Sequence, residues 1–96
     1  MPHYIILGNF IEQGIRNIKD TIKRAEAFKA AVEKAGGKFV SHYYTLGKTD
    51  FVTIVEAPND ETIIPAILST ASLGNARTET LKAFTVDEAA KIIERV

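Results

Sequence analysis

The first segment of the chain, His3 to Phe10, carries apolar side chains on both sides of an extended backbone. Its apolar residues are mostly β-branched or aromatic: Tyr4, Ile5, Ile6, Leu7 and Phe10. Such residues favour strands, and a strand that is buried on both faces has no polar side. The pattern therefore predicts a central strand. Residues Ile11 to Lys19 lack a clear period and contain Gly14, so we expect a connection there with one helical turn.

A helical period begins at Asp20. The apolar positions then recur at three- and four-residue intervals and share one helical face: Ile22, Ala25, Phe28, Val32 and Ala35. Asp20 or Thr21 can cap the first turn with a side-chain oxygen. Gly36 and Gly37 end the helix, because glycine adopts the left-handed conformation without a steric penalty.

Three further strands are expected. The segments Lys38 to Leu46 and Asp50 to Ala57 are rich in Val, Ile, Thr, Tyr and Phe, which favour strands. The link Gly47-Lys48-Thr49 joins them and predicts a hairpin with a loop of about three residues. The remaining strand is expected over Asn75 to Phe84.

A second long helix is expected after Pro58, with Asn59 as its cap. Its buried face comprises Ile63, Ile64, Ile67, Leu68 and Ala71. Pro65 lacks the amide hydrogen that an interior helical position donates, whereas the first turn tolerates proline. A start near Thr62, or a kink, is therefore favoured over a regular helix from Asn59.

The C-terminal segment opens with a capping box, Thr85-Val86-Asp87-Glu88. In this motif a hydroxyl and a carboxylate each accept a hydrogen bond from an otherwise unpaired amide. We expect a short helix here, with an inward face that comprises Val86, Ala89, Ala90, Ile93 and Val96.

The predicted order of elements is β, α, β, β, α, β, α. Two right-handed βαβ crossings joined by a hairpin produce a four-stranded antiparallel sheet with both long helices on one face. The fold class is therefore α+β, a ferredoxin-like βαββαβ sandwich with an additional C-terminal helix. The other sheet face still carries apolar side chains, and such a surface favours self-association. We expect a homo-oligomer, in the simplest case a dimer through the sheet face.

Composition bounds the number of domains and the classes of partner. The 96 residues suit a single domain, residues 1–96, with one core. The absence of cysteine excludes disulfides, thiolate metal sites and thiol nucleophiles. The 12 basic and 12 acidic side chains cancel, so nucleic acid is a disfavoured partner. The chain has neither a signal-peptide pattern nor an apolar run of the roughly 20 residues that span a bilayer. We therefore expect no membrane association and a cytoplasmic location.

Motifs for phosphate, metal or cofactor binding are weak. Gly47-Lys48-Thr49 resembles the end of a phosphate-binding P-loop, but His42 stands where that motif needs glycine, and a strand follows instead of a helix. The two histidines, His3 and His42, lie on different strands with no ligand pair at a recognised spacing. We expect no metal site and no cofactor.

Four side chains are candidates for ligand binding: His42, Tyr44, Asp50 and Arg77. Strand alternation places His42 and Tyr44 on one face, where they line a pocket or pack in a core or interface. Asp50 is either a general base at a pocket mouth or a turn carboxylate that binds backbone amides. Arg77 is either an anion-binding residue or one half of an ion pair with Glu79. No catalytic residue is assigned.

Several segments together resemble the GYD-domain family of small bacterial and archaeal proteins. They are Gln13-Gly14, Lys19-Asp20-Thr21, Arg24, Tyr43-Tyr44-Thr45, Leu46 to Asp50, Val52 to Pro58 and Ser72 to Leu81. The family's Gly-Tyr-Asp motif corresponds to Gly47, Thr49 and Asp50, with Lys48 in the intervening position and Thr49 in place of the tyrosine. The resemblance covers nearly the whole chain. It implies a ferredoxin-like domain of the dimeric α/β-barrel type and no particular activity.

Three functions fit these observations. The first is an oligomeric domain without catalytic activity that binds a small molecule or a protein partner on or beside its sheet. The second is a cofactor-independent enzyme of the dimeric α/β-barrel type, an oxygenase or an isomerase, with His42, Tyr44 and Asp50 around a pocket. The third is a purely structural assembly module.

Overall fold

A four-stranded antiparallel sheet organises the chain. The computed structural model describes all 96 residues, and its strands are β1 (His3–Phe10), β2 (Lys38–Tyr44), β3 (Phe51–Glu56) and β4 (Ala76–Ala83). Their order across the sheet is β2-β3-β1-β4, so β1 is central, as the apolar residues on both of its sides predict. This order, with antiparallel pairing throughout, is that of the ferredoxin-like fold expected from the sequence.

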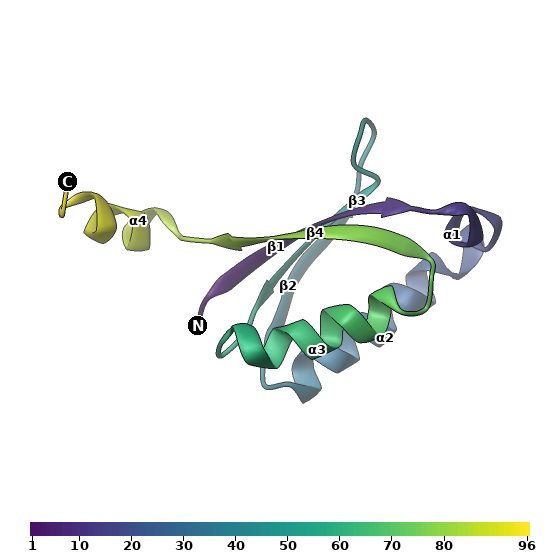
Figure 1. Cartoon of the computed structure of the whole chain (residues 1–96), viewed down its shortest axis with the longest axis horizontal. Helices are drawn as coiled ribbons and strands as arrows, with labels where there is room; N and C mark the ends of the chain where they lie inside the picture. The colour runs from purple at the N-terminus through teal and green to yellow at the C-terminus, as the bar shows by residue number, and fades with distance from the viewer.

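Both long helices lie on the same face of this sheet. They are α2 (Thr21–Lys34) and α3 (Asp60–Ala71), which pack side by side below the sheet in Figure 1. The connection from β1 to α2 contains a short helix, α1 (Glu12–Arg16), and a 3₁₀ turn at Ile18–Asp20, so the predicted helical turn is confirmed. None of the helices has the length and apolar composition of a bilayer-spanning helix.

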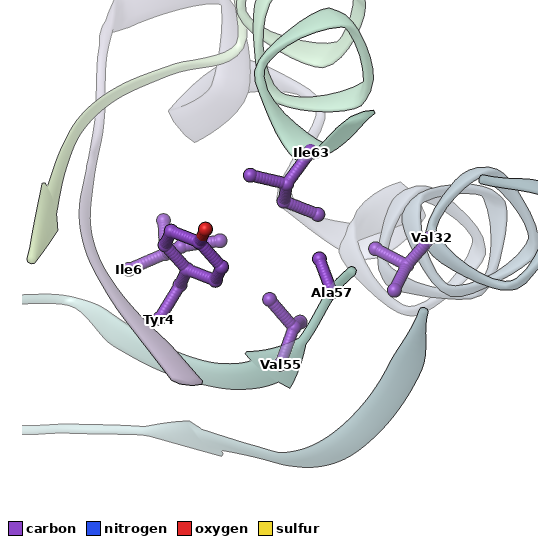
Figure 2. Packing of buried hydrophobic residues seen from close by; sticks show 6 residues of the cluster. All are labelled: Tyr4, Ile6, Val32, Val55, Ala57 and Ile63. Carbon is purple, nitrogen blue, oxygen red and sulfur yellow. The ribbon is translucent and has the colours of Figure 1, made fainter. Parts of the chain in front are cut away.

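The core lies between one half of the sheet and the two long helices. Its enclosed side chains come from both layers and are drawn in Figure 2: Tyr4, Ile6, Val32, Val55, Ala57 and Ile63. Phe28, Phe39 and Ile67 pack against this cluster. Val32 and Ile63 reach the sheet because the apolar residues of each helix share one face.

The end of α2 is where the glycines predict it, but its start is not capped as expected. Gly36 has a φ of 85°, which is the left-handed conformation that glycine adopts without strain. The amide of Gly37 then bonds to the carbonyl of Val32 at 2.9 Å, which pairs one of the last carbonyls of the helix. Asp20 occupies the N-cap position, but neither it nor Thr21 makes a side-chain capping bond there. The predicted side-chain cap is therefore wrong.

The hairpin between β2 and β3 has a longer loop than the sequence suggests. Residues 45–50 lie outside both strands, so both predicted strands are too long at this end. The Thr45 hydroxyl donates to the carbonyl of Thr49, and Gly47 has a φ of 124°. The Thr45 amide also donates to the carbonyl of Asp50 at 2.8 Å, so the chain reverses between these two residues, where the left-handed glycine permits the turn.

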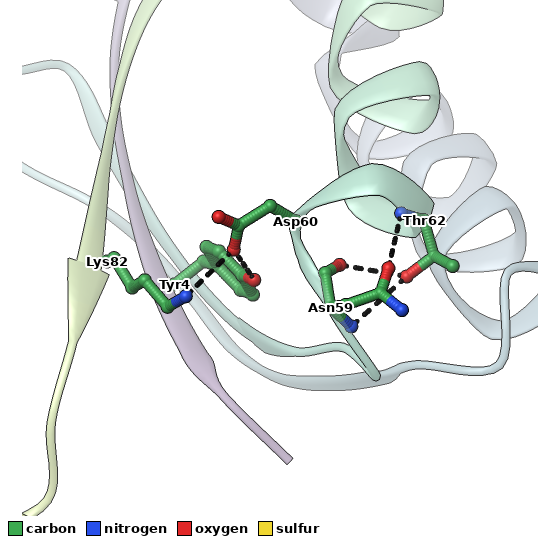
Figure 3. A network of polar contacts seen from close by, with 5 residues as sticks. All are labelled: Tyr4, Asn59, Asp60, Thr62 and Lys82. Atoms are coloured by element: carbon green, nitrogen blue, oxygen red, sulfur yellow. Dashed lines mark hydrogen bonds and ion pairs between the residues drawn. The ribbon is translucent and has the colours of Figure 1, made fainter.

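Helix α3 begins earlier than Pro65 suggests. The Asn59 side chain accepts a hydrogen bond from the Thr62 amide at 3.0 Å, and the Thr62 side chain completes a capping box (Figure 3). The helix then runs over Asp60–Ala71 with Pro65 inside it, so the favoured start near Thr62 is wrong. The cap and the burial of Ile63 outweigh the one helical hydrogen bond that proline removes.

A polar network joins the start of α3 to the sheet (Figure 3). The Tyr4 hydroxyl donates to the Asp60 carboxylate, and Lys82 Nζ lies 3.1 Å from the same oxygen. Burial raises the pKa of Tyr4 to about 12, and the bond to Asp60 adds to this shift. The bonds from Tyr4 and Lys82 lower the pKa of Asp60. Near neutral pH, Tyr4 therefore stays protonated and Asp60 ionised, and together with Lys82 they tie β1, α3 and β4 together.

The C-terminal helix, α4 (Val86–Ile93), projects beyond the sheet instead of covering it (Figure 1). The predicted capping box is present: Thr85 Oγ1 accepts from the Glu88 amide at 3.1 Å, and the Glu88 carboxylate accepts from the Thr85 amide at 2.8 Å. The predicted inward face is wrong, because α4 contains no buried residue and Val86 is 86% exposed. The capping box therefore stabilises a helix that has no apolar surface to pack on within its own chain.

Alternation along the strands divides the sheet's side chains between two faces. Ile6 pairs with Thr53 on the helix side, and both are buried. The neighbouring pair, Ile5 and Ile54, points to the other side, which no helix covers. We call this side the open sheet face; its apolar residues are Ile5, Leu7, Tyr43, Val52, Ile54 and Leu81. The uncovered apolar face predicted from the sequence is therefore present.

Two neighbouring isoleucines of α3 test the packing of this layer. Ile63 is 1% exposed and Ile64 is 48% exposed. We expect Ile63→Ala to lower the free energy of unfolding by about 2–5 kcal/mol, because a buried isoleucine leaves a cavity. Ile64→Ala, the matched control, should cost less than about 1 kcal/mol. Urea denaturation followed by circular dichroism measures both, and equal losses would contradict the observed helical face.

Candidate functional site

A cavity of about 520 Å³ lies between the sheet and the two long helices. Its sheet side includes Ile6, His42 and Thr53, and its helix side includes Phe28 and Ile67. Several exposed residues also line it, so it opens to solvent. Small-molecule sites are commonly clefts of roughly 300–1,000 Å³ with mostly apolar walls and a few polar groups. This cavity is therefore the first candidate site.

A β-bulge in β2 directs His42 into the cavity. Phe39 pairs with Val55 and faces the helices, so strict alternation from Phe39 would turn His42 toward the open sheet face. The register shifts between Phe39 and Ser41, and His42 consequently pairs with Thr53 on the helix side. A bulge adds one residue to a strand and so reverses the alternation beyond it.

His42 presents a neutral imidazole with one unused nitrogen. Its Nδ1 lies 2.8 Å from Thr53 Oγ1, and its ring packs edge-on to Tyr44 with 4.9 Å between the ring centres. Its Nε2 is buried and has no hydrogen-bond partner. Burial lowers the pKa of His42, because desolvation disfavours the charged imidazolium.

Tyr44 lies beside His42, but its hydroxyl is engaged elsewhere. The Tyr44 Oη lies 3.2 Å from Thr21 Oγ1, a contact that joins β2 to the start of α2. The side chain is 45% exposed. Of the four residues predicted from the sequence, the structure therefore brings His42 and Tyr44 together.

Asp50 and Arg77 lie apart from this pair. The Asp50 carboxylate accepts a hydrogen bond from the Phe10 amide at 2.9 Å. It thus binds a backbone amide, as one alternative predicts, but the amide belongs to β1 and not to its own turn. No hydrogen bond or ion pair joins Asp50 to His42, so Asp50 lacks the contact with an imidazole that its general-base role requires. Arg77 lies on the open sheet face, opposite Asn9, and forms no ion pair with Glu79. No group of three potential ligands is arranged to hold a metal ion.

Arg24 lines the cavity from α2 and is not among the four residues predicted from the sequence. Its guanidinium carbon lies 6.0 Å from the centre of the Phe10 ring. Its nitrogens donate to the carbonyls of Asn17 at 2.9 Å and Gly14 at 3.4 Å. One feature of the sequence could have indicated this position: Arg24 is adjacent to Ala25, one of the apolar positions of α2.

Comparisons with known proteins bear on the family and the fold. The model of the GYD domain family matches residues 4–93. A curated relative from Thermus thermophilus is 33% identical over 87 residues, which cover 90% of this chain and 92% of the relative. That relative is named glutamine synthetase and cystathionine beta-lyase binding protein.

Two crystal structures resemble this chain in fold. MtbAldR matches with a TM-score of 0.68 at 13% identity, over 88% of this chain and 52% of that one. TTHA0845, also from Thermus thermophilus, matches with a TM-score of 0.57 at 23% identity, over 90% and 96% of the two chains. At these identities the likeness supports the ferredoxin-like fold alone.

The environment of His42 predicts an acid-sensitive contribution to stability. Its pKa in the folded chain lies below the ordinary value of 6.5, so its contribution is present above that pH and is lost as the pH falls through the folded-state pKa. Proton NMR of the ring should show a midpoint below 6.5, and His42→Asn assigns the signal. A midpoint at or above the ordinary value would contradict the buried environment.

Proposed function

Since this chain belongs to the GYD-domain family, we propose that it is a protein-binding domain that works as a homo-oligomer. The proposal is carried by the open sheet face, which leaves an apolar surface uncovered in the single chain. The relative named as a binding protein for two enzymes supports a protein partner. We infer that the partner is an enzyme and that the association takes place in the cytoplasm, the location expected from the sequence.

The apolar content of the open sheet face favours contact with a second copy. Ile5 and Ile54 at its centre are only partly buried, and Leu81 is 42% exposed. Just 10 of the 96 residues are buried, so the single chain leaves much apolar surface in water. Large contiguous apolar patches are uncommon on monomers. Two such faces packed against each other would cover both patches in a twofold dimer.

The charges around the open sheet face also suit a second copy. The charged residues on this side of the strands are Lys38, Glu56, Arg77 and Glu79. A polar rim around an apolar centre is typical of protein interfaces. The two signs balance, so two copies meet without net repulsion and can form complementary contacts under twofold symmetry.

The apolar face of α4 is the surface we assign to the enzyme partner. It comprises Val86, Ala89, Ala90 and Ile93, at the spacing i, i+3, i+4 and i+7. Helices that insert into grooves of other proteins use this spacing. In the single chain α4 projects past the sheet (Figure 1) and has no buried residue. We therefore expect this face to stay accessible when two sheets pair.

Self-association is tested with a charge on the open sheet face. We expect Leu81→Glu to convert the dimer to a monomer, because the interface would then bury an unpaired carboxylate. Leu81 is already 42% exposed, so the single chain tolerates the charge. Leu68→Glu, at a position of α3 that is 62% exposed, is the matched control and should remain dimeric. Sedimentation equilibrium measures both; a dimer that persists in Leu81→Glu would contradict the assigned face.

Partner binding is tested with purified glutamine synthetase and cystathionine β-lyase from the protein's own organism. We expect at least one of them to bind, and Ile93→Asp to weaken that binding by about tenfold or more. Ile92→Asp places the same charge off the apolar face of α4 and is the control. Isothermal titration calorimetry measures affinity. Failure of both enzymes to bind, or equal effects of the two substitutions, would contradict the assignment, whereas dissociation of the dimer by Ile93→Asp would place α4 in the self-contact.

A further inference from the structure

We propose that the cavity between the sheet, α2 and α3 is a binding site for an apolar monocarboxylate, with Arg24 as the contact for its carboxylate. This site is separate from the open sheet face and from α4, so it does not depend on the protein-binding function proposed above. It rests on the composition of the cavity wall, on the charge of Arg24 and on the unpaired nitrogen of His42.

The shape and composition of the cavity select an apolar ligand. Its volume of about 520 Å³ is within the range of small-molecule sites. A row of ring contacts lines it: Phe10 and Phe51 lie 5.3 Å apart between ring centres, and Phe51 and His42 lie 5.6 Å apart. This row leads from Arg24, over the Phe10 ring, to His42. An apolar body lying along it would exclude water from the rings.

The Phe51 ring holds its place because the neighbouring strand position is glycine. A Cβ at Gly8 would lie 2.0 Å from the Phe51 ring, far inside van der Waals contact. Gly8 and Phe51 are register partners in β1 and β3. The glycine therefore lets the tip of the aromatic ring lie against β1, where the ring forms part of the cavity wall.

The charge of the cavity lining selects an anion. The charged residues among the lining are Asp20, Lys23 and Arg24, with one net positive charge. Arg24 forms no ion pair, and its two hydrogen bonds go to neutral backbone carbonyls. A guanidinium carries five N–H donors, so donors remain for a carboxylate. A single available guanidinium in an apolar wall fits a monoanion better than a phosphate with two charges.

The second polar contact is Nε2 of His42. This atom is buried without a hydrogen-bond partner, and buried polar atoms are paired in most native structures. Its ring lies in the cavity lining, held by Thr53. A ligand that fills the cavity would bring a hydrogen-bonding group or an ordered water to this nitrogen. His42 is therefore both part of the site and a reporter for its occupation.

The test compares three probes of equal chain length on the full chain: decanoate, decanol and decylammonium. Titration calorimetry at neutral pH should show one decanoate per chain, bound about tenfold or more tightly than decanol, with decylammonium weakest. The His42 ring signals should shift during the decanoate titration with the same dissociation constant. Equal binding of decanoate and decanol, saturation without a change at His42, or no decanoate binding in the millimolar range would each overturn the proposal.

Variants separate the charge from the packing of Arg24. Arg24→Gln should reduce the affinity for decanoate to that for decanol and leave the affinity for decanol unchanged. Arg24→Lys keeps the charge and should retain the preference of decanoate over decylammonium even if the bonds to Asn17 and Gly14 are lost. Arg77→Gln makes the same change on the opposite sheet face and should have no effect. A decanoate preference that survives Arg24→Gln, or disappears in Arg77→Gln, would contradict the assigned contact.

Discussion

The sheet of this chain is covered by helices on one face only, and its other properties follow from that constraint. Right-handed crossings from one strand to the next place α2 and α3 on the same side, where their apolar faces close over Tyr4, Val55 and the rest of the core. No element is left for the other side, because α4 leaves the sheet at the end of β4. The strands nevertheless carry apolar side chains toward that side, since β1 and β3 are apolar on both faces. The single chain thus buries the apolar side chains of one sheet face and leaves those of the other face uncovered.

The covered side is itself divided into a packed half and a hollow half. Around Tyr4 and Val55 the layers meet tightly, and the polar network from Tyr4 through Asp60 to Lys82 fixes the start of α3 on the sheet. Toward the other end of β1, rings replace aliphatic side chains and the cavity opens between the layers. The bulge in β2 turns His42 into this half. Two separate surfaces therefore result: an interior cavity, for which we propose a small ligand, and exterior faces, for which we propose protein partners.

The strands and helices that pack in the core could be predicted well from the sequence. The two-sided apolar pattern of β1 located the central strand, and the glycines at the end of α2 located its last turn, because burial and backbone sterics act there without competition. The start of α3 differs from the prediction, which gave more weight to Pro65 than to the Asn59 cap. The helix keeps the early start because packing of its buried residues adds to the cap, and the sequence does not show that packing. The hairpin loop is longer than predicted because regular strand pairing ends at Tyr44 and Phe51, and bonds from Thr45 to Thr49 and Asp50 close the loop. The inward face of α4 was predicted from the helical spacing of its apolar residues. That spacing shows which residues share a face, but it does not show whether another element packs against that face.

The candidate site was less accessible to sequence reasoning. His42 and Tyr44 were found as neighbours on one strand face, but the face itself depends on a one-residue bulge that no residue pattern marks. Arg24 could not be selected from the sequence, because the strand residues that line the cavity with it, such as His42 and Phe51, are distant in the chain. Asp50 bonds to the backbone of β1, a contact that exists only after the sheet has formed.

The central claim is that the open sheet face is covered in solution. NMR of methyl groups with a dissolved paramagnetic probe tests it directly, because the probe broadens signals that water can reach. If the face is covered, the methyls of Ile5, Ile54 and Leu81 will be protected, whereas those of Leu68 on α3 will be broadened. Broadening of Leu81 and Ile54 to the same extent as Leu68, at a concentration where the sheet faces should be paired, would contradict the account.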